Sequence, residues 1–359
     1  MSRVMKTALT FPVYKTKNSK LPETDFSNLV FGRTVSDHMF VADYKNGEWT
    51  DLRIEEYKPL QLNPANATLH YGQSIFEGMK AYRTPDGLVS VFRGDANWRR
   101  LNESAERMCM PTLPEDIFME GLMQLLELDR DWVPTADGAS LYVRPFMFAT
   151  DDYIGVKPSE TYKFMIFTCP VGMYYSKPVS VKVETNYTRA TEGGTGYAKT
   201  AGNYAASLYP ALQAQQDGYD QLLWTDGKNH SQIEESGTMN VMFKINGKII
   251  TAPIHTGTIL KGITRDSVIQ LASDWNEPLE ERFLTTEELE EALKNGDLEE
   301  AFGTGTAATI AHIERIHING TDYHLPEKGT DAFSNRVLRE LDGIKYGQLP
   351  DPHGWVIKI

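Results

Sequence analysis

Strand-like runs and amphipathic helical patterns alternate along the chain in two groups, and this alternation constrains the fold more than any other feature. Short β-rich runs predict strands, and a 3.6-residue apolar period predicts helices. In the first group we expect strands at 28–35, 38–44, 87–93, 140–150 and 162–171 and helices at 96–111 and 114–133. In the second we expect strands at 179–185, 220–225, 239–245 and 248–253, a strand running into Gly303, and helices at 204–216, 264–275, 285–296 and 330–347. The pattern predicts a mixed α/β or α+β protein.

A polar segment rich in Pro and Gly, at 174–194, separates the two groups. With 359 residues the chain is long enough for two domains, each with its own core. We therefore expect a small N-terminal α/β domain at 1–174, a linker at 175–188 and a larger C-terminal α/β domain at 189–359. Ligand sites favour domain interfaces, so the active site is expected in the interdomain cleft.

Bulk composition narrows the class of function. A formal charge of -13 disfavours binding to nucleic acid or to an anionic membrane, and no apolar run has the length of a membrane span. The N-terminus lacks the long apolar centre of a secretory signal. Two cysteines far apart, Cys109 and Cys169, favour reduced, buried thiols and a cytoplasmic location. We expect a cytoplasmic enzyme or small-molecule binder without a metal.

Lys199 lies in a run of glycines and small residues, GGTGYAKTAGNYAAS, which begins at Gly193. Three interpretations are open. A P-loop would use Lys199 on a phosphate, but Ala198 stands where the second glycine belongs, and a polar segment separates the run from the preceding strand. A solvated surface lysine needs no small neighbours. A lysine that meets a flat ligand does need them, and desolvation favours its reactive neutral form.

Two glycine-containing segments predict anion sites. Gly262 precedes a predicted helix, so the N–H groups of Ile263 and Thr264 could bind a phosphate, although Thr264 could also be an ordinary N-cap. The turn that carries Thr306 and Ala307 presents hydroxyls and backbone amides, which suit a phosphate or carboxylate, or form a plain glycine turn.

Three charged residues complete the candidate set. Glu234 and Glu235 are solvated unless one is buried, in which case it needs a cation or N–H partner, such as a protonated heterocyclic nitrogen. Arg144 lies in an apolar run and either forms a buried salt bridge or binds a substrate carboxylate. A lysine, two phosphate-type sites, an acid and an arginine together suit pyridoxal phosphate.

Six ordered motifs carry a resemblance to a known family. LHYGQSIFEGMKAYR, SLYVRPF, GYAKTAGNYAAS, EESGTMNVM, LKGITRDS and FGTGTAA follow one another in the chain. They resemble the branched-chain amino acid aminotransferases, which are fold type IV pyridoxal phosphate enzymes, from about Leu29 to near the C-terminus. The resemblance implies a two-domain fold type IV enzyme with pyridoxal 5′-phosphate as cofactor.

The resemblance also implies roles for cofactor-binding residues. Lys199 would bind the cofactor aldehyde covalently and, once released, move the proton between Cα and C4′. Glu235 rather than Glu234 would face the pyridine nitrogen, and Tyr204 would hydrogen-bond the phenolic oxygen. The phosphate would rest on Arg100 rather than Arg99, on the Ile263 and Thr264 backbone and on Thr306, with Thr238 beside the cofactor.

For the substrate, the resemblance implies an aromatic pocket with one arginine. The turn amides at Thr306 and Ala307 would hold the α-carboxylate, and Arg144 would take the second carboxylate of glutamate. The segment 151–159 resembles a loop that reaches the neighbouring subunit's site, which implies a homodimer. The implied pocket wall consists of Phe31, Tyr71, Phe76, Tyr142, Tyr174 and Thr238.

The implied reaction is reversible transfer of the amino group of L-leucine, L-isoleucine or L-valine to 2-oxoglutarate by a ping-pong mechanism. Fold type IV alternatives are a D-amino acid aminotransferase, an amine transaminase and an aminodeoxychorismate lyase. A P-loop protein or an inactive cofactor binder would be of another class. The chain departs from vertebrate members at Ala308 and Ala311, where they carry a Cys-x-x-Cys pair.

Overall fold

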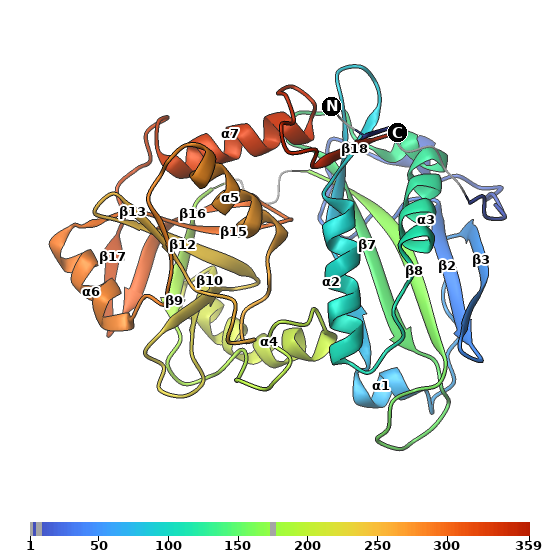
Figure 1. Cartoon of the computed structure of the whole chain (residues 1–359), viewed down its shortest axis with the longest axis horizontal. Coiled ribbons are helices and arrows are strands. Elements are labelled where there is room, and N and C mark those ends of the chain that lie inside the picture. Colours follow the sequence, from blue (N-terminus) through green and yellow to red (C-terminus); the bar gives the residue numbers. More distant parts are fainter. Residues whose placement is uncertain (1–2, 5–8, 173–176) are drawn as a thin grey trace. The chain divides into compact units, whose positions relative to one another are not determined.

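The structure is a computed structural model that describes residues 3–4, 9–172 and 177–359 (Figure 1). The chain divides into two compact units. The first unit contains residues 1–174, 198–201 and 343–359, and the second contains 175–197 and 202–342. We describe each unit by itself.

The first unit is built on a nine-stranded sheet with the order β1-β18-β6-β5-β7-β8-β2-β3, in which β4 also pairs with β7. Its strands are β1 (Arg3–Val4), β2 (His38–Lys45), β3 (Glu48–Glu56), β4 (Ser74–Phe76), β5 (Met79–Arg83), β6 (Val89–Phe92), β7 (Ser140–Ala149), β8 (Tyr162–Val171) and β18 (Val356–Lys358). Its helices are α1 (Ala67–Tyr71), α2 (Gly94–Arg107) and α3 (Glu115–Leu128), with 3-10 turns at Leu21–Glu23 and Arg130–Trp132.

Helices α2 and α3 pack on this sheet and enclose its core (Figure 1). Helix α3 begins after Pro114, and Glu115 and Asp116 in its first turn complement the helix dipole. Gly121 allows the close approach of the two layers, because a Cβ there would lie 2.8 Å from the ring of Phe40. The helix ends at Leu128, earlier than the apolar pattern predicts.

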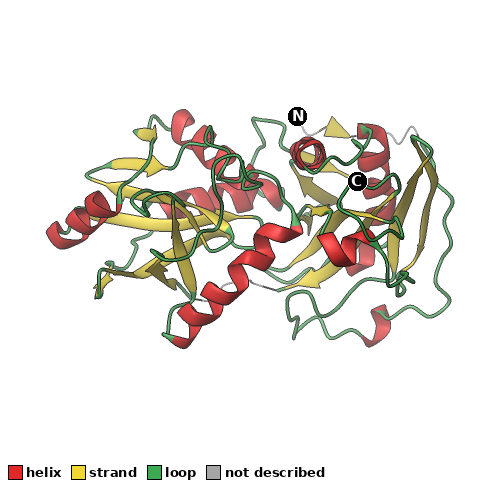
Figure 2. Ribbon diagram, turned by 90° about the horizontal axis from the view of Figure 1, so that it is seen from below, coloured by secondary structure: helices red, strands yellow, loops and turns green. Residues whose placement is uncertain are grey.

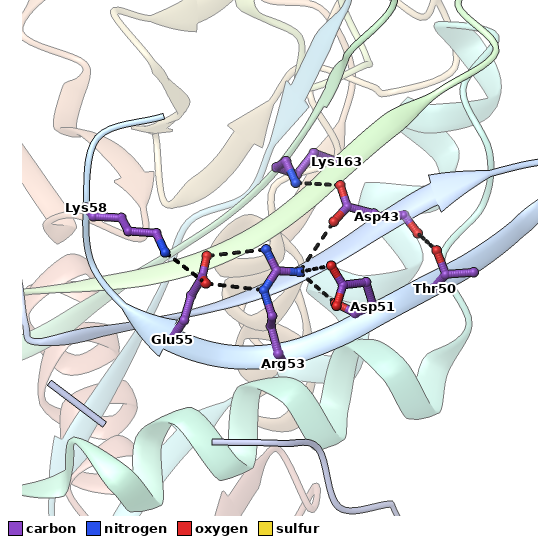
Figure 3. A network of polar contacts seen from close by, with 7 residues as sticks. All are labelled: Asp43, Thr50, Asp51, Arg53, Glu55, Lys58 and Lys163. Atoms are coloured by element: carbon purple, nitrogen blue, oxygen red, sulfur yellow. Dashed lines mark hydrogen bonds and ion pairs between the residues drawn. The ribbon is translucent and has the colours of Figure 1, made fainter. Parts of the chain in front are cut away.

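A network of ion pairs joins the neighbouring strands β2, β3 and β8 (Figure 3). Arg53 forms ion pairs with Asp51, Glu55 and Asp43, and the distance from Arg53 Nη1 to Asp43 Oδ2 is 3.3 Å. Asp43 also forms an ion pair with Lys163. Burial alone would raise the pKa of Glu55, but Arg53 and Lys58 lower it. Because most of these side chains keep contact with solvent, the network contributes little stability.

The second unit contains a sheet that closes on itself. The path runs β11-β10-β9-β16-β15-β12-β13-β14, and β11 also pairs with β12, so that six strands form a ring. Its strands are β9 (Val179–Val183), β10 (Gln221–Thr225), β11 (Ile233–Ser236), β12 (Met239–Ile245), β13 (Lys248–Thr251), β14 (Leu279–Glu281), β15 (Leu298–Gly305), β16 (Thr309–Ile318) and β17 (Thr321–His324). The remaining helices are α4 (Ala201–Gln216), α5 (Ile263–Asp274), α6 (Thr286–Asn295) and α7 (Phe333–Lys345).

The second core consists largely of side chains from this ring, such as Val181, Leu223 and Phe243. The helices of this unit are drawn in red and its strands in yellow in Figure 2.

The two ends of helix α6 are determined by residues of the local sequence. Thr285 accepts a hydrogen bond from the Glu288 N–H (3.0 Å) at the start, and Gly296 ends the helix with φ +76°. Helices α5 and α6 both pack on β15.

Most elements predicted from periodicity are confirmed, and three further expectations need correction. Residues 28–35 form turns rather than a strand, because Gly32 adopts φ +73° and the Arg33 N–H donates to the Val30 carbonyl. The expected linker 175–188 contains β9, which pairs with β10 and β16 inside the second sheet. Cys109 is exposed, whereas Cys169 is buried as expected.

Candidate active site

Lys199 lies in a four-residue segment, 198–201, that belongs to the first unit although its flanking residues belong to the second. Its backbone N–H donates to the Ser104 Oγ (2.9 Å) and its carbonyl accepts from the Phe76 N–H (3.0 Å). The Thr200 hydroxyl donates to the Ser74 carbonyl (2.7 Å). The segment is thus fixed to β4 and α2, and Lys199 Nζ lies 4.9 Å from the centre of the Phe76 ring.

This setting differs from a P-loop and from a solvated lysine. Strand β9 ends at Val183, well before Lys199, whereas a P-loop joins a strand directly to a helix. The side chain lies on an aromatic face, and its backbone is held on both sides. We therefore retain the interpretation that Lys199 meets a flat ligand.

Arg100 is buried in α2 and pairs with a carboxylate that sequence analysis did not single out. Glu77 is 0% exposed and accepts from Arg100 Nε and Nη2, both at 2.8 Å. It also accepts from Asn97 Nδ2 at 2.7 Å. Burial alone would raise the pKa of Glu77, but Arg100, the nearby Lys199 and Asn97 hold it below its usual range. The pair therefore remains charged.

Arg144 stands among aromatic rings on β7. Its Nη2 donates to the Tyr142 hydroxyl (2.8 Å), and its guanidinium lies 4.7 Å from the Phe76 ring centre. The ring of Phe31 meets Tyr142 edge-on at 5.0 Å. Among the described residues no carboxylate lies within ion-pair distance of Arg144, and its buried Nε has no acceptor. The alternative of a buried salt bridge is therefore wrong, and the group can receive a carboxylate.

The first unit thus brings together Lys199, Arg100, Phe31, Phe76, Tyr142 and Arg144 through shared contacts or neighbouring strands. Tyr71 ends α1, is 40% exposed and contacts the ring of His70. Tyr174 lies outside the described residues. The remaining predicted site residues belong to the second unit.

Glu235 is buried on β11 and is surrounded by donors. Its Oε1 accepts from the Leu260 N–H (2.8 Å) and from Asn240 Nδ2 (3.3 Å), and its Oε2 lies 3.0 Å from Arg189 Nε. These partners favour the charged carboxylate. An ionised, fixed acid of this kind fits a protonated heterocyclic nitrogen.

Glu234 differs from its neighbour, because successive strand residues face opposite sides of a sheet. Its Oε1 accepts from the Thr258 hydroxyl at 2.5 Å, and its buried Oε2 has no partner among the described residues. Burial raises the pKa of Glu234, although the Thr258 hydrogen bond and Arg189 oppose the shift. The environments of the two glutamates favour Glu235 as the ionised group.

Helix α5 begins with Ile263 and Thr264, and Gly262 before it has no side chain to cap the first N–H groups. Such groups lack intrahelical acceptors and attract anions. A Cβ on Gly262 would lie 1.9 Å from Asn240 Oδ1, so the glycine permits this close approach. Asn240 Nδ2 also donates to the Leu260 carbonyl (2.9 Å), which ties the start of α5 to the surroundings of Glu235.

Thr306 and Ala307 form the turn between β15 and β16. Strand pairing places Asn240 between Glu235 of β11 and Thr304 of β15, so this turn continues from the strand beside Asn240. Thr238 is exposed in the β11–β12 turn, and Tyr204 lies in the first turn of α4. The second unit therefore carries a fixed acid, a helix start and an amide-rich turn.

Sequence reasoning missed the residues that support this site. Glu77, Ser104, Arg189 and Asn240 each contact a predicted site residue. The only sequence signal was an acidic residue, Glu77, inside an otherwise apolar run. Among the described residues no group of three or more His, Cys, Asp and Glu could hold a metal, and no described helix is both long and apolar enough to cross a membrane.

Comparison with known proteins gives a consistent result. Residues 74–316 match the model of the amino-transferase class IV family. The chain is 45% identical over 346 residues to branched-chain-amino-acid aminotransferase 2 of Bacillus subtilis (strain 168), and the match covers 95% of each chain. The crystal structure of the Escherichia coli branched-chain amino acid aminotransferase is 26% identical, with a TM-score of 0.73 over 89% of this chain and 98% of that one.

Proposed function

Because the chain belongs to the branched-chain-amino-acid aminotransferases of aminotransferase class IV, we propose that it transfers the amino group of L-leucine, L-isoleucine or L-valine to 2-oxoglutarate. The products are the branched-chain 2-oxo acid and L-glutamate. The reaction is reversible and ping-pong, with pyridoxal 5′-phosphate as cofactor. The extent of the match to the Bacillus relative, 95% of each chain, supports the assignment of the whole reaction.

The residues present fit this cofactor. Lys199 would bind its aldehyde, Glu235 would pair with the pyridine nitrogen, and Tyr204 would hydrogen-bond the phenolic oxygen. The phosphate would be bound by Arg100, the first N–H groups of α5 at Ile263 and Thr264, and Thr306. The ionised state of Glu235, which is held by Arg189 and the Leu260 N–H, is the feature that a protonated ring nitrogen requires.

When bound, pyridoxal phosphate withdraws electrons from the substrate Cα. The protein's own part is to hold charges and move one proton. Lys199, whose backbone is fixed by Ser104 and Phe76, would take the proton from Cα and deliver it to C4′. Glu235 would keep the ring nitrogen protonated. The turn amides at Thr306 and Ala307 would orient the α-carboxylate.

Arg144 accounts for a pocket that accepts both an apolar side chain and a carboxylate. Phe31, Phe76 and Tyr142 supply apolar surface around it. The guanidinium has a buried Nε without an acceptor among the described residues, which glutamate or 2-oxoglutarate would provide. With leucine bound, the same group can remain against the aromatic faces.

The single observation that carries the proposal is the insertion of residues 198–201, with Lys199, into the first unit. The test is an absorption spectrum of the purified protein, followed by L-leucine without an acceptor. We expect the visible band of lysine-bound cofactor to give way to the near-ultraviolet band of pyridoxamine phosphate, and to return with 2-oxoglutarate. Lys199→Ala should remove both the band and turnover.

Other outcomes would point elsewhere. A yellow protein that ignores leucine but bleaches with a D-amino acid or an amine would move the substrate to another fold type IV class. A yellow protein without any half-reaction would be a binder, and a colourless protein that does not take up the cofactor would refute the proposal.

We also propose a homodimer in the cytoplasm. The loop 151–159 has exposed apolar residues at its tip, namely Tyr153, Ile154 and Val156, while Asp151 holds its base through the Glu160 and Thr161 N–H groups. A second copy would cover this tip. Light scattering should give twice the chain mass, and Ile154→Ser with Val156→Ser should shift the protein toward the monomer. Cell fractionation tests the location.

A further inference from the structure

Glu77 is a completely buried carboxylate, and it pairs with Arg100, which would bind the cofactor phosphate. It accepts two hydrogen bonds from Arg100 and one from Asn97. The Gly78 N–H donates to Glu77 Oε2 (3.2 Å), the oxygen that also accepts from Asn97. A carboxylate with this many donors is fixed in position and charge.

The contact with Arg100 has a defined geometry. Glu77 Oε1 meets Nε and Oε2 meets Nη2, so one planar group faces the other along an edge. Such a bidentate contact fixes the plane of a guanidinium, and it uses two of its five N–H groups. The directions in which the other three N–H groups of Arg100 point are therefore determined by Glu77.

Glu77 is also next in sequence to Phe76, the ring that Lys199 contacts. The charge of Lys199 is one of the causes that lower the pKa of Glu77, and Phe76, the residue before Glu77, lies under Lys199 Nζ. The carboxylate is the paired counter-charge of Arg100. Without it, the positive charge of Arg100 would remain buried and unpaired.

We infer that Glu77 is a positioning residue that fixes Arg100 in the orientation that binds the cofactor phosphate. The inference rests on the proposed function, because it needs a phosphate on Arg100. The inference makes a prediction that would not follow if the ion pair between Glu77 and Arg100 only stabilised the fold. Loss of Glu77 should weaken binding of ligands that carry a phosphate far more than binding of the same ligand without one.

The experiment compares two ligands, pyridoxal 5′-phosphate and pyridoxal, on the full chain after removal of cofactor. Dissociation constants are measured by absorption and by protein fluorescence. In Glu77→Gln the new amide places an N–H group against Arg100, so the bidentate contact is lost. We expect affinity for pyridoxal phosphate to fall roughly ten-fold or more, and affinity for pyridoxal to change less than about three-fold.

Asp43→Asn is the matched control. Asp43 is a buried carboxylate of the same unit, and it pairs with Arg53 and Lys163 (Figure 3). Its loss also removes one carboxylate partner of an arginine, so it reports the effect of breaking such a pair at residues that are not assigned to the cofactor. We expect the ratio of the two dissociation constants to remain that of the parent protein in this variant.

Arg100→Ala separates failure of the inference from failure of the proposed function. If Arg100→Ala leaves the ratio unchanged, the phosphate assignment of Arg100 is wrong. If Arg100→Ala changes the ratio and Glu77→Gln does not, or weakens both ligands equally, only the role of Glu77 is refuted. In the double variant the second substitution should add little to the ratio, since both remove the same contact.

Glu77→Asp provides a second test should Glu77→Gln fail to fold. It keeps the negative charge and is one methylene shorter, so it cannot reach both nitrogens in the same geometry. The inference expects the same selective loss for the phosphate-bearing ligand. A parent-like ratio in a folded Glu77→Asp variant would refute the positioning role.

Discussion

Gly262→Ala should destabilise the second unit through one contact. The backbone at Gly262 has φ −65° and ψ 127°, which any L-residue adopts, so no strain opposes the substitution. The new methyl carbon would, however, lie 1.9 Å from Asn240 Oδ1 and 3.1 Å from its Cγ. Because this is far below van der Waals contact, the Asn240 amide has to move.

The size of the effect follows from what Asn240 holds. Its Nδ2 donates to the Leu260 carbonyl at 2.9 Å and to Glu235 Oε1 at 3.3 Å. Losing a neutral hydrogen bond and a longer, charge-assisted one costs roughly 1 to 3 kcal/mol. Replacing glycine lowers the entropy of the unfolded chain and returns about 0.4–1 kcal/mol. We therefore expect a net loss of about 1 kcal/mol in the free energy of unfolding.

Urea unfolding of the cofactor-free chain measures this loss. Gly329→Ala is the control, because nothing lies within 4 Å of a Cβ at that position and the residue is exposed. It should leave the free energy of unfolding within about 0.5 kcal/mol of the parent value. Asn240→Ala supplies the second arm, since it removes the amide with which the new methyl collides.

In the Asn240→Ala background, Gly262→Ala should cost much less, because the amide is gone and its two hydrogen bonds are already lost. The contact that remains is with Arg265 Cβ at 3.2 Å, which requires a shift of only a few tenths of an ångström. The reasoning is refuted if Gly262→Ala is as stable as the parent. It is also refuted if the substitution costs the same with and without Asn240, since the collision would then not be the cause.

Three further predictions concern the charged and thiol groups. Arg144→Ala should lower kcat/KM for glutamate and 2-oxoglutarate roughly ten-fold or more and that for leucine much less, by steady-state kinetics; an equal loss for both would mean that Arg144 holds the α-carboxylate. Burial raises the pKa of Glu234, so its contribution to stability is present below its ordinary value of 4.5 and is lost as pH rises through the raised pKa. Glu234→Gln, which cannot ionise, should therefore gain stability relative to the parent as pH rises from 4.5 to 8 in urea unfolding, and a constant difference would contradict this. Burial raises the pKa of Cys169 to about 11, whereas Cys109 is exposed, so iodoacetamide at about pH 8 should label Cys109 alone, as read by peptide mass.

Local patterns predicted most helices and many of the strands, because periodicity depends only on which face of an element is buried. The apolar period at 264–275 corresponds to α5, and the run at 162–171 to β8. The run at 28–35 failed because Gly32 and the turn closed by Arg33 outweigh its apolar content. The closure of the second sheet by β11 and β12 depends on long-range pairing, which no local pattern contains.

The candidate site shows the same division. Motifs identified Lys199, Glu235 and Arg144, because their residue types carry chemistry. Their partners could not be found in this way, since Ser104 and Arg189 are ordinary residues until the fold brings them within contact distance. That residues 198–201 belong to the first unit, although their neighbours in sequence belong to the second, is likewise a property of the fold and not of the local sequence.

Two buried arginine–carboxylate pairs, Arg100 with Glu77 and Arg189 with Glu235, would present opposite charges to the proposed cofactor. In the first unit Arg100 would meet the phosphate while Glu77 supports it. In the second, Glu235 would meet the ring nitrogen while Arg189 supports it. An anionic phosphate would thus meet a cationic side chain, and a cationic ring nitrogen would meet an anionic one.

Each pair also keeps its ligand-binding charge compensated before the cofactor arrives, which avoids the large cost of burying a lone charge. The supporting residue and the ligand-binding residue should therefore behave as one unit in mutagenesis. Loss of Glu77 or Arg189 should resemble loss of Arg100 or Glu235 in its effect on cofactor affinity. Loss of Asp43, which pairs with Arg53 and Lys163, should not.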